Sequence, residues 1–341
     1  MEIEDDKSRS LQRGRLTKVV RRFAERRRIV VVGDLLADQF LHGEISRVSR
    51  EAPVLILRHE CTETTPGGAA NCAVNLAALG AQATLVGVVG DDEPGQALLE
   101  KLQAANVDCQ NIVIAQGTHT TTKVRVLAGQ MHSTRQQVIR IDYENQSRIE
   151  EHICLSLREK LSEAAREADA VIISDYNYGV ADESMAETVR EATAQSNIPV
   201  ILDSRFRLQH FQGFASATPN EDEVEQLLGT QLNGETKLET AGAQLRERLN
   251  YGALLITRGS HGMMLFEAGK EPLQIEPIGA REAVDVTGAG DTVIAAYTLA
   301  IASGASFADA ARIANHAGGL VVMKRGTASI TNEELLSSVL R

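Results

Sequence analysis

Short apolar runs alternate with amphipathic stretches along almost the whole chain after residue 28. Runs at 28–33, 84–89, 170–174, 199–203 and 253–257 predict strands that are apolar throughout, the pattern of strands buried on both faces. Helices are predicted at 70–79, 94–105, 149–168, 182–195, 220–228, 238–249, 288–303, 307–323 and 332–340. This alternation predicts an α/β fold with a mainly parallel sheet and helices on each side.

Two stretches break the alternation. Residues 40–58 and 120–143 read as extended, with mixed polar and apolar positions and no intervening helix, which is typical of edge or hairpin strands. We expect them to form a small second sheet that projects from the main domain, covering a cleft or meeting a second subunit. No linker divides residues 28–341, so we expect one domain with a discontinuous β lid.

Residues 1–27 are predicted to be a basic helical extension. The segment 13–28 carries eight arginines and lysines against one acidic residue, Glu25. Leu16, Val19, Val20 and Phe23 recur within it at helical spacing. A basic amphipathic helix can bind a membrane surface or an acidic partner, but packing on its own domain is the preferred interpretation.

The overall charge and the cysteines exclude several classes of protein. A formal net charge of −11 argues against a general nucleic-acid binder, which needs a basic surface. Four scattered cysteines, Cys61, Cys72, Cys109 and Cys154, are typical of free thiols in a reducing compartment. No run approaches membrane-spanning length and no secretory signal is visible, so we expect a cytoplasmic protein.

The segment 285–292 carries the strongest chemical signal. Gly288, Ala289 and Gly290 lead into an apolar helical run, so their backbone N–H groups and the helix dipole can hold an anion such as a phosphate. Asp291 follows in the first turn, where a carboxylate could take a proton from an attacking hydroxyl. The alternative is a tight turn followed by an ordinary N-terminal helix charge.

Two further places carry polar residues at the predicted cleft. Asp34 and Asp38 follow the first strand, where open α/β sheets bind ligands and where carboxylates could bind sugar hydroxyls; alternatively Asp34 only caps the turn. Gly67 and Gly68 open the next helix and permit close approach of a ligand, with Asn71 one turn in. The alternative there is a helix start that needs small residues for packing.

Two segments suit a nucleotide and its metal. Asn220 and Glu223 form the sequence of a capping box, or they hold the water shell of a phosphate-bound Mg²⁺. Thr257, Gly259 and Gly262 let the chain leave a strand through glycines, as backbone lying against a nucleotide would. The P-loop motif, the Gly-x-Gly-x-x-Gly fingerprint and the protein-kinase motifs are absent.

Residues 67–71 and 285–291 together resemble the paired signatures of the ribokinase-like (PfkB) family of sugar kinases, over roughly residues 28–340. Residues 33–34, 46–54, 122–126 and 135–142 are similar to the branch of bacterial heptose-7-phosphate kinases. The resemblance implies a three-layer α/β/α domain with a small β lid, ATP as phosphate donor, Mg²⁺ and often a lid-to-lid dimer. It is also compatible with a bound monovalent cation.

The resemblance also implies roles for single residues. Asp291 would be the base, and residues 288–290 would form the anion hole. Asn220 and Glu223 would form the motif near the metal and the phosphates. The sugar contacts would be Asp34, Gly67, Gly68 and Asn71. Asn315 and Gly326 lie in a segment that resembles the closing helix and nucleotide loop. Arg125, Arg135 and Arg140 are candidates for a phosphate already on the sugar, or they lie on a solvated lid face. Lys123 and Arg125, two apart on a predicted strand, should point together.

The sequence departs from that branch at two places. After Asp175, a candidate substrate contact, Tyr178 stands where the branch has a cleft lysine. After Asp203, Arg205 stands where the branch has lysine, and could still meet a nucleotide phosphate. The related bifunctional enzymes carry a nucleotidyltransferase domain after the kinase; because this sequence ends at Arg341, we expect kinase activity alone.

These observations predict an ATP-dependent kinase of the anomeric hydroxyl of heptose 7-phosphate. The alternatives are a PfkB-type kinase of another sugar, such as ribose, fructose or fructose phosphate, and a catalytically silent sugar- or nucleotide-binding regulator.

Overall fold

A computed structural model describes residues 2–129, 136–145, 148–232, 234–279 and 282–341. Its strands are β1 (Arg28–Gly33), β2 (Leu35–Val48), β3 (Leu55–Gly68), β4 (Gln82–Gly90), β5 (Ile112–Ala115), β6 (Thr122–Gly129), β7 (Gln136–Tyr143), β8 (Ala170–Asp175), β9 (Val200–Ser204), β10 (Ser216–Ala217), β11 (Ala253–Thr257), β12 (Met263–Glu267) and β13 (Leu273–Ile275). Its α-helices are α1 (Glu2–Arg21), α2 (Ala69–Leu79), α3 (Glu93–Ala104), α4 (Glu151–Arg166), α5 (Glu183–Thr193), α6 (Glu221–Leu228), α7 (Glu235–Arg248), α8 (Ala289–Ala302), α9 (Phe307–Val321) and α10 (Asn332–Leu340).

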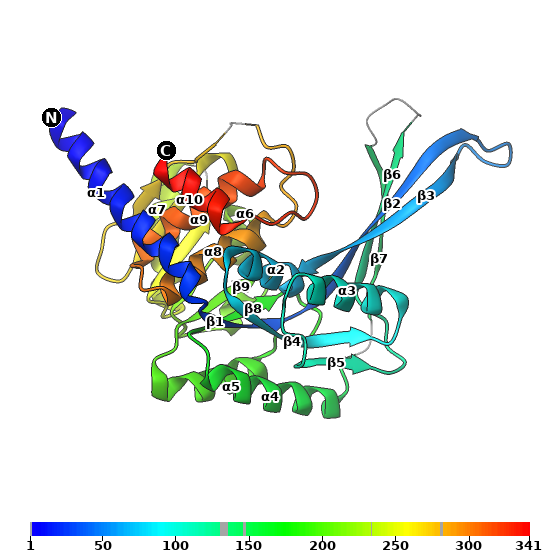
Figure 1. The fold of residues 1–341 in the computed structure, drawn as a ribbon, viewed down its shortest axis with the longest axis horizontal. Coiled ribbons are helices and arrows are strands. Elements are labelled where there is room, and N and C mark those ends of the chain that lie inside the picture. The colour runs from blue at the N-terminus through cyan, green and yellow to red at the C-terminus, as the bar shows by residue number, and fades with distance from the viewer. Residues whose placement is uncertain (1, 130–135, 146–147, 233, 280–281) are drawn as a thin grey trace.

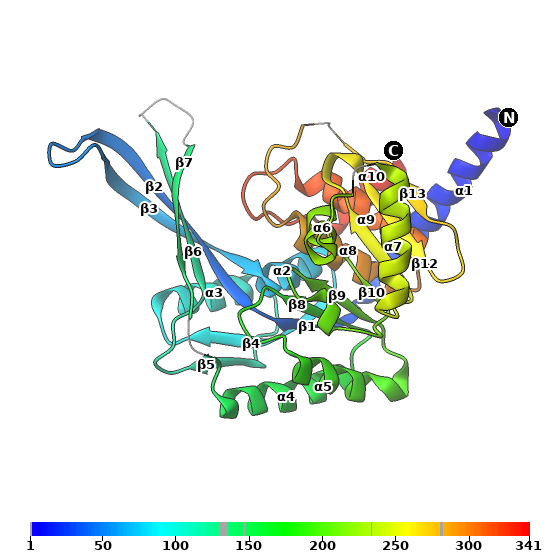
Figure 2. The same cartoon turned by 180° about the vertical axis from the view of Figure 1, so that it is seen from behind.

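The main sheet runs in the order β13-β12-β11-β10-β9-β8-β1-β4-β5, and all its neighbours are parallel except the pairs that β12 makes with β11 and β13. Successive residues of β1 point to opposite sides of the sheet. Ile29 and Val31 join the core with α1, α2, α3, α8, α9 and α10, while Val30 and Val32 join the core with α4, α5, α6 and α7. The predicted three-layer α/β/α fold with a mainly parallel sheet is thus confirmed (Figures 1 and 2).

The second sheet has the order β3-β2-β6-β7, with β2 parallel to β6 and the outer pairs antiparallel. It projects from the main domain as a long curved ribbon (Figure 1). Its strands extend beyond the two predicted stretches, since β2 begins directly after Asp34 and β3 continues to Gly68. The pair β2 and β3 therefore starts and ends at buried residues that lie beside α2.

Four strands of the main sheet, β5, β10, β12 and β13, are not predicted from the sequence. Two to four residues carry too little periodicity to be recognised in β5, β10 and β13. The strand β12 begins with Met263, Met264 and Leu265, residue types that favour helix by intrinsic propensity. Tertiary pairing with β11 overrides that preference.

The N-terminal helix α1 packs against the domain beside α9 and α10 (Figure 1). All four residues of the predicted apolar stripe are buried: Leu16, Val19 and Val20 on α1, and Phe23 in the short 3₁₀ helix (Arg22–Glu25) that follows it. Two of its arginines face the same elements, since Arg15 pairs with Asp309 at 3.2 Å and Arg13 donates to the carbonyl of Arg341. Among the described helices, none is long and apolar enough to cross a bilayer.

Candidate active site

A cavity of about 340 Å³ opens where the lid meets the carboxyl ends of the main strands. The start of α8 lines this cavity, and so do Lys123, Arg125 and Arg140 of the lid. Arg205, Asn220, Glu223 and Thr257 line it from the ends of β9 to β11. The structure therefore brings together residues from four separate motifs of the sequence.

Gly288 gives α8 an open N-terminus. It has a φ of +74° and no side chain caps the helix, so the first N–H groups of α8 are left without a side-chain acceptor. A Cβ on Gly288 would lie 2.5 Å from the side-chain nitrogen Nδ2 of Asn71. Gly288, Ala289 and Gly290 all line the cavity, so the helix start can receive an anion there.

Asp291 lies in the first turn of α8 and is only 3% exposed. Asn71 Nδ2 donates to Asp291 Oδ2 at 2.7 Å, and the hydroxyl of Tyr176 donates to Asp291 Oδ1 at 2.8 Å. Burial raises the pKa of Asp291 to about 6, although both hydrogen bonds act to lower it. A carboxylate with such a pKa is mostly ionised at neutral pH and can still accept a proton.

A buried network fixes Asn71. Asn75 Nδ2 donates to the backbone oxygen of Asn71 at 2.9 Å, and Thr292 Oγ1 donates to Asn75 Oδ1 at 2.9 Å. The networked asparagines and Thr292 are buried. Asn71 thus orients the carboxylate of Asp291, which is a role beyond the sugar contact expected from the sequence.

Asp34 holds a turn. Its carboxylate accepts backbone N–H groups of Tyr176 at 2.8 Å, Tyr178 at 3.0 Å and Val180 at 3.0 Å. Burial raises the pKa of Asp34, and these three bonds oppose the rise. Asp34 therefore does bind the backbone of a turn, although this is the turn after β8 and not the one that follows its own strand.

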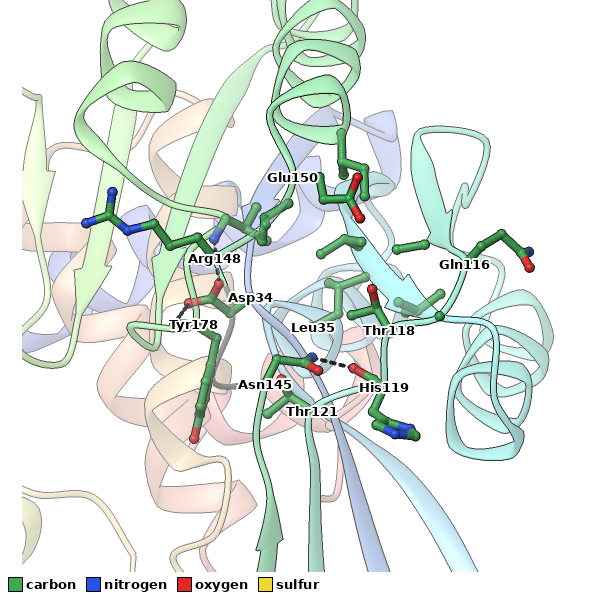
Figure 3. A pocket seen from close by; sticks show the side chains of 17 residues that line it. Asp34, Leu35, Gln116, Thr118, His119, Thr121, Asn145, Arg148, Glu150 and Tyr178 are labelled. Carbon is green, nitrogen blue, oxygen red and sulfur yellow. Dashed lines mark hydrogen bonds between the residues drawn. The ribbon is translucent and has the colours of Figure 1, made fainter.

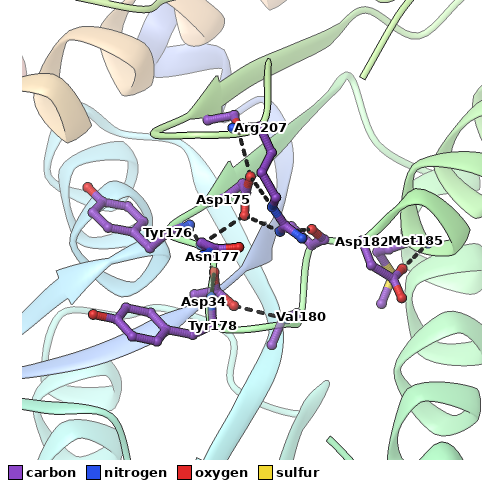
Figure 4. A network of polar contacts seen from close by, with 11 residues as sticks. Asp34, Asp175, Tyr176, Asn177, Tyr178, Val180, Asp182, Met185 and Arg207 are labelled. Atoms are coloured by element: carbon purple, nitrogen blue, oxygen red, sulfur yellow. Dashed lines mark hydrogen bonds and ion pairs between the residues drawn. The ribbon is translucent and has the colours of Figure 1, made fainter. Parts of the chain in front are cut away.

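Asp175 is buried in the same region. It accepts from Arg207 and from Ser204 Oγ, the latter at 2.7 Å, and from the backbone N–H of Asn177 at 2.9 Å (Figure 4). Arg207 is not identified from the sequence, because a basic residue three positions after a strand carries no periodic or motif signal. The carboxylate of Asp175 is thus engaged in holding two loops together.

The cations of the lid share one face. Asp38, Lys123 and Asp142 lie opposite one another across β2, β6 and β7, and Arg125 lies opposite Arg140 in the next pair. Arg125 pairs with Asp38, and Arg140 pairs with Asp142. Arg135, the third predicted phosphate contact, lies outside the described residues.

Lys123 differs from its two neighbours. It is 5% exposed, and within the described residues it has no hydrogen bond or ion pair. Its ammonium lies 5.6 Å from the ring centroid of Tyr176 and 5.4 Å from that of Tyr178. Burial lowers the pKa of Lys123, and the charges of Asp38 and Asp142 on the neighbouring strands oppose that shift. Lys123 and Arg125 do point together into the cavity.

The capping box of α6 is formed. Asn220 accepts from the N–H of Glu223 at 2.8 Å, and Glu223 accepts from the N–H of Asn220 at 2.9 Å. Glu223 also lines the cavity beside Asp203, a carboxylate outside the set predicted from the sequence. Burial raises the pKa values of both. No cluster of three or more acidic, histidine or cysteine residues that could hold a metal occurs in the described part of the chain.

The residues predicted to bind the nucleotide do not all lie in one cavity. Thr257 and Arg205 line the cavity of Asp291. Gly326 donates its N–H to Asp285 Oδ2 at 2.9 Å and borders a larger hollow of about 1100 Å³ under the lid. Gly259, Gly262 and Asn315 line neither: Asn315 Nδ2 donates to the backbone of Glu276 at 2.7 Å, and a Cβ on Gly262 would lie 2.1 Å from the carbonyl of Ile275.

Another cavity, of about 240 Å³, lies beside the turn that follows β8 (Figure 3). Among the described site residues predicted from the sequence, only Asp34 borders it; the lining includes the apolar Val89 and Ile153 and the polar Thr118 and Asn145. It is separate from the residues that surround Asp291.

Solved structures share this architecture. A ribokinase from Arabidopsis thaliana, complexed with ribose and ATP, matches 92% of this chain and 99% of its own with a TM-score of 0.72 at 23% identity. Phosphofructokinase-2 from Escherichia coli, in complex with potassium, matches 92% of this chain and 99% of its own with a TM-score of 0.73 at 19% identity. The fold is that of the ribokinase-like kinases.

The sequence comparisons define the family. The model of the pfkB family of carbohydrate kinases matches residues 26–334, and the chain belongs to this family of sugar kinases, which are phosphotransferases. It is 38% identical over 309 residues to the bifunctional protein HldE of Desulfatibacillum aliphaticivorans and 41% identical over 314 residues to that of Pseudomonas syringae pv. syringae. These alignments cover 90% and 92% of this chain but only 62% and 64% of the relatives.

Proposed function

We propose that the protein transfers the γ-phosphate of ATP to the anomeric hydroxyl of heptose 7-phosphate. The main support for the chemistry is Asp291, a buried carboxylate held from two sides at the open start of α8. The ribokinase of similar fold is described with ribose and ATP, and the curated relatives are named HldE. The lid motifs resemble the heptose-7-phosphate kinases.

In the proposed reaction the acceptor hydroxyl loses its proton to Asp291 as its oxygen attacks the γ-phosphorus. The bond between the γ-phosphorus and the β–γ bridging oxygen breaks, and ADP leaves. The N–H groups of Gly288 and Gly290 stabilise the charge on the transferred group, whereas that of Ala289 donates to the carbonyl of Val286 at 3.2 Å. Bound Mg²⁺ would neutralise charge on the phosphates of ATP.

The residues near the cavity fit a magnesium ion that keeps most of its water. Glu223 and Asn220 would bind that water shell, and Asp203 adds a second carboxylate. Burial raises the pKa values of Asp203 and Glu223, and the charge of Glu223 raises that of Asp203 further; a divalent cation would relieve both effects. Mg²⁺ commonly binds through one or two carboxylates together with substrate phosphates.

The preference for a phosphosugar rests on the lid. Lys123 is a buried cation without an ionic partner in the described part of the chain, and Arg125 and Arg140 stand beside it. Two arginines opposite each other on neighbouring strands repel, and a phosphate between the lid and the body would relieve that repulsion. Arginine can bind such a phosphate while keeping its carboxylate partner, because it has five donors.

The test compares catalytic efficiency on heptose 7-phosphate with that on unphosphorylated heptose, ribose and fructose. Arg125→Ala should lower kcat/KM for the phosphosugar about tenfold to a hundredfold, the range expected from losing a hydrogen bond to a charged group, and leave free sugars unaffected. Arg47→Ala, an exposed arginine of β2 outside the cavity, is the matched control. Equal efficiency on free sugars would favour another sugar kinase, and no turnover with any sugar would favour a binding regulator.

We also propose a homodimer through the lid. The strand β7 is exposed along its whole length and forms an edge of its sheet. Ile139, Ile141 and Tyr143 alternate with Arg140 and Asp142, so they form an apolar row on the face away from the cavity. An exposed apolar row beside an unpaired edge is suited to contact with a second copy.

A further inference from the structure

The turn that follows β8 is fixed more firmly than an ordinary surface loop. Asn177 and Gly179 have φ values of +66° and +104°, and this alternation turns the N–H groups of 176, 178 and 180 toward the single carboxylate of Asp34. Asp175 anchors the start of the turn to Arg207 (Figure 4). The backbone at Tyr176 is therefore held from both sides.

Two tyrosines extend from this turn on the side away from Arg207 (Figure 4). Both rings lie under the ammonium of Lys123. Their hydroxyls go to different partners, since Tyr176 donates to Asp291 at 2.8 Å and Tyr178 donates to Glu144 at 2.7 Å. Only Tyr176 thus connects the turn to the carboxylate that the proposed reaction uses.

We propose that Tyr176 is a positioning residue that fixes the orientation of Asp291 and stabilises its ionised form. The inference rests on the proposed role of Asp291 as base. Asn71 binds one carboxylate oxygen and Tyr176 the other, so the two donors together define the plane of the carboxylate. With Asn71 alone, the carboxylate could rotate about its remaining contact, and its lone pair would no longer face the acceptor hydroxyl.

The hydroxyl of Tyr176 also favours the charged form of Asp291, because it donates to the carboxylate. Its effect adds to those of the other groups around Asp291. Lys123 on β6 lowers the pKa of Asp291 and Asp38 on β2 raises it, while Asp203 on β9 and the thiol of Cys72 on α2 interact with the same charge. Arg205, after β9, lines the same cavity. None of these charged groups replaces the hydrogen bond that Tyr176 donates.

The experiment measures kcat/KM as a function of pH for the wild type, Tyr176→Phe and Tyr178→Phe with the same sugar substrate. If Asp291 is the base, the acid limb of the wild type should follow its pKa, which burial raises to about 6. Tyr176→Phe removes one donor to the carboxylate, so the pKa should rise further and the acid limb should move to higher pH by about one unit. Activity on the alkaline side should also fall, since the carboxylate is less well oriented.

Tyr178→Phe is the matched control, because it removes the other hydroxyl of the turn and keeps the ring under Lys123. Its acid limb should coincide with that of the wild type. Thermal unfolding of both variants checks that the turn is intact; a phenylalanine ring fills the same space in each case. A merely structural role of Tyr176 would change Tm or the level of activity without moving the limb.

Asp291→Asn separates this inference from the proposed function. Near-complete loss of turnover in Asp291→Asn, with unmoved acid limbs in both tyrosine variants, would overturn the role of Tyr176 and leave the base in place. Substantial turnover in Asp291→Asn would overturn the base itself. A limb that moves equally in Tyr176→Phe and Tyr178→Phe would also contradict the inference, because only one hydroxyl contacts Asp291.

Discussion

Asp291 has an environment that opposes its charge and a pair of donors that supports it. It is buried, and Asp38 lies close enough to raise its pKa further. Asn71 and Tyr176 compensate by donating one hydrogen bond to each oxygen. An ordinary N-terminal helix charge would be exposed and would not need two buried donors, so the geometry favours a chemical role over simple helix stabilisation.

At the same scale, Asp291→Asn should lower turnover by roughly 10²–10⁴-fold, the usual contribution of a general base. ATP affinity should change little, because the N–H groups at 288–290 are backbone atoms that the substitution keeps. Steady-state kinetics measures the first quantity and calorimetric titration with ATP the second. A variant with near-full turnover would contradict the assignment.

Among the elements, α1 shows how a basic helix can be part of a core. Leu16, Val20 and Phe23 are at most 3% exposed and lie in the same hydrophobic cluster as α9 and α10. In the structure this apolar stripe packs on the rest of the domain. Arg13, Arg15, Lys18 and Arg21 are exposed, and two of them contact Asp309 and the last residue of the chain.

Phe23→Ala should lower the free energy of unfolding by about 3–5 kcal/mol, the cost of an unfilled cavity at a buried aromatic residue. Chemical denaturation provides the measurement. Leu11→Ala on α1, at a position that is 61% exposed, should change the free energy of unfolding by less than about 0.5 kcal/mol. Similar small effects from both substitutions would mean that this N-terminal segment contributes little to the folded domain.

In the whole molecule, the lid presents different chemistry on its two faces. The face toward the body carries Lys123, Arg125 and Arg140, whereas the opposite face of β7 carries Ile139, Ile141 and Tyr143. On the body side, Thr65 of β3 contacts Thr327 through their hydroxyls at 2.6 Å. The lid is thus tied to the body near the larger hollow, while its outer face remains available to a second copy.

If the protein is a dimer through this face, Ile141→Asp should convert it to a monomer, because the interface would have to bury a charge. Sedimentation velocity distinguishes the two masses. Ile114→Asp is the control, since Ile114 is an exposed isoleucine on β5, an edge strand of the main sheet. This substitution should leave the dimer intact. A wild-type protein that sediments as a monomer at high concentration would contradict the proposal.

The sequence by itself determined the fold class and pointed to the start of α8 as the candidate site. Apolar strands alternate with helices throughout, and this local periodicity specifies a parallel sheet covered on both faces. The glycines before α8 and the aspartate in its first turn are likewise local features, so Gly288 and Asp291 could be recognised without any knowledge of their neighbours. The capping box of Asn220 and Glu223 was equally readable, because it depends on four consecutive residues.

Only the tertiary structure decided which residues meet. Tyr176 lies 115 positions from Asp291, and Arg125 lies 87 positions from Asp38; no local pattern relates such pairs. They meet because the carboxyl ends of parallel strands lie along the same edge of the sheet, and because the register of β2, β6 and β7 brings particular residues opposite one another. The use of Asp34 and Asp175 to fix one turn was decided in the same way. Local periodicity specifies which element forms, but the contacts between distant elements depend on how their buried faces pack.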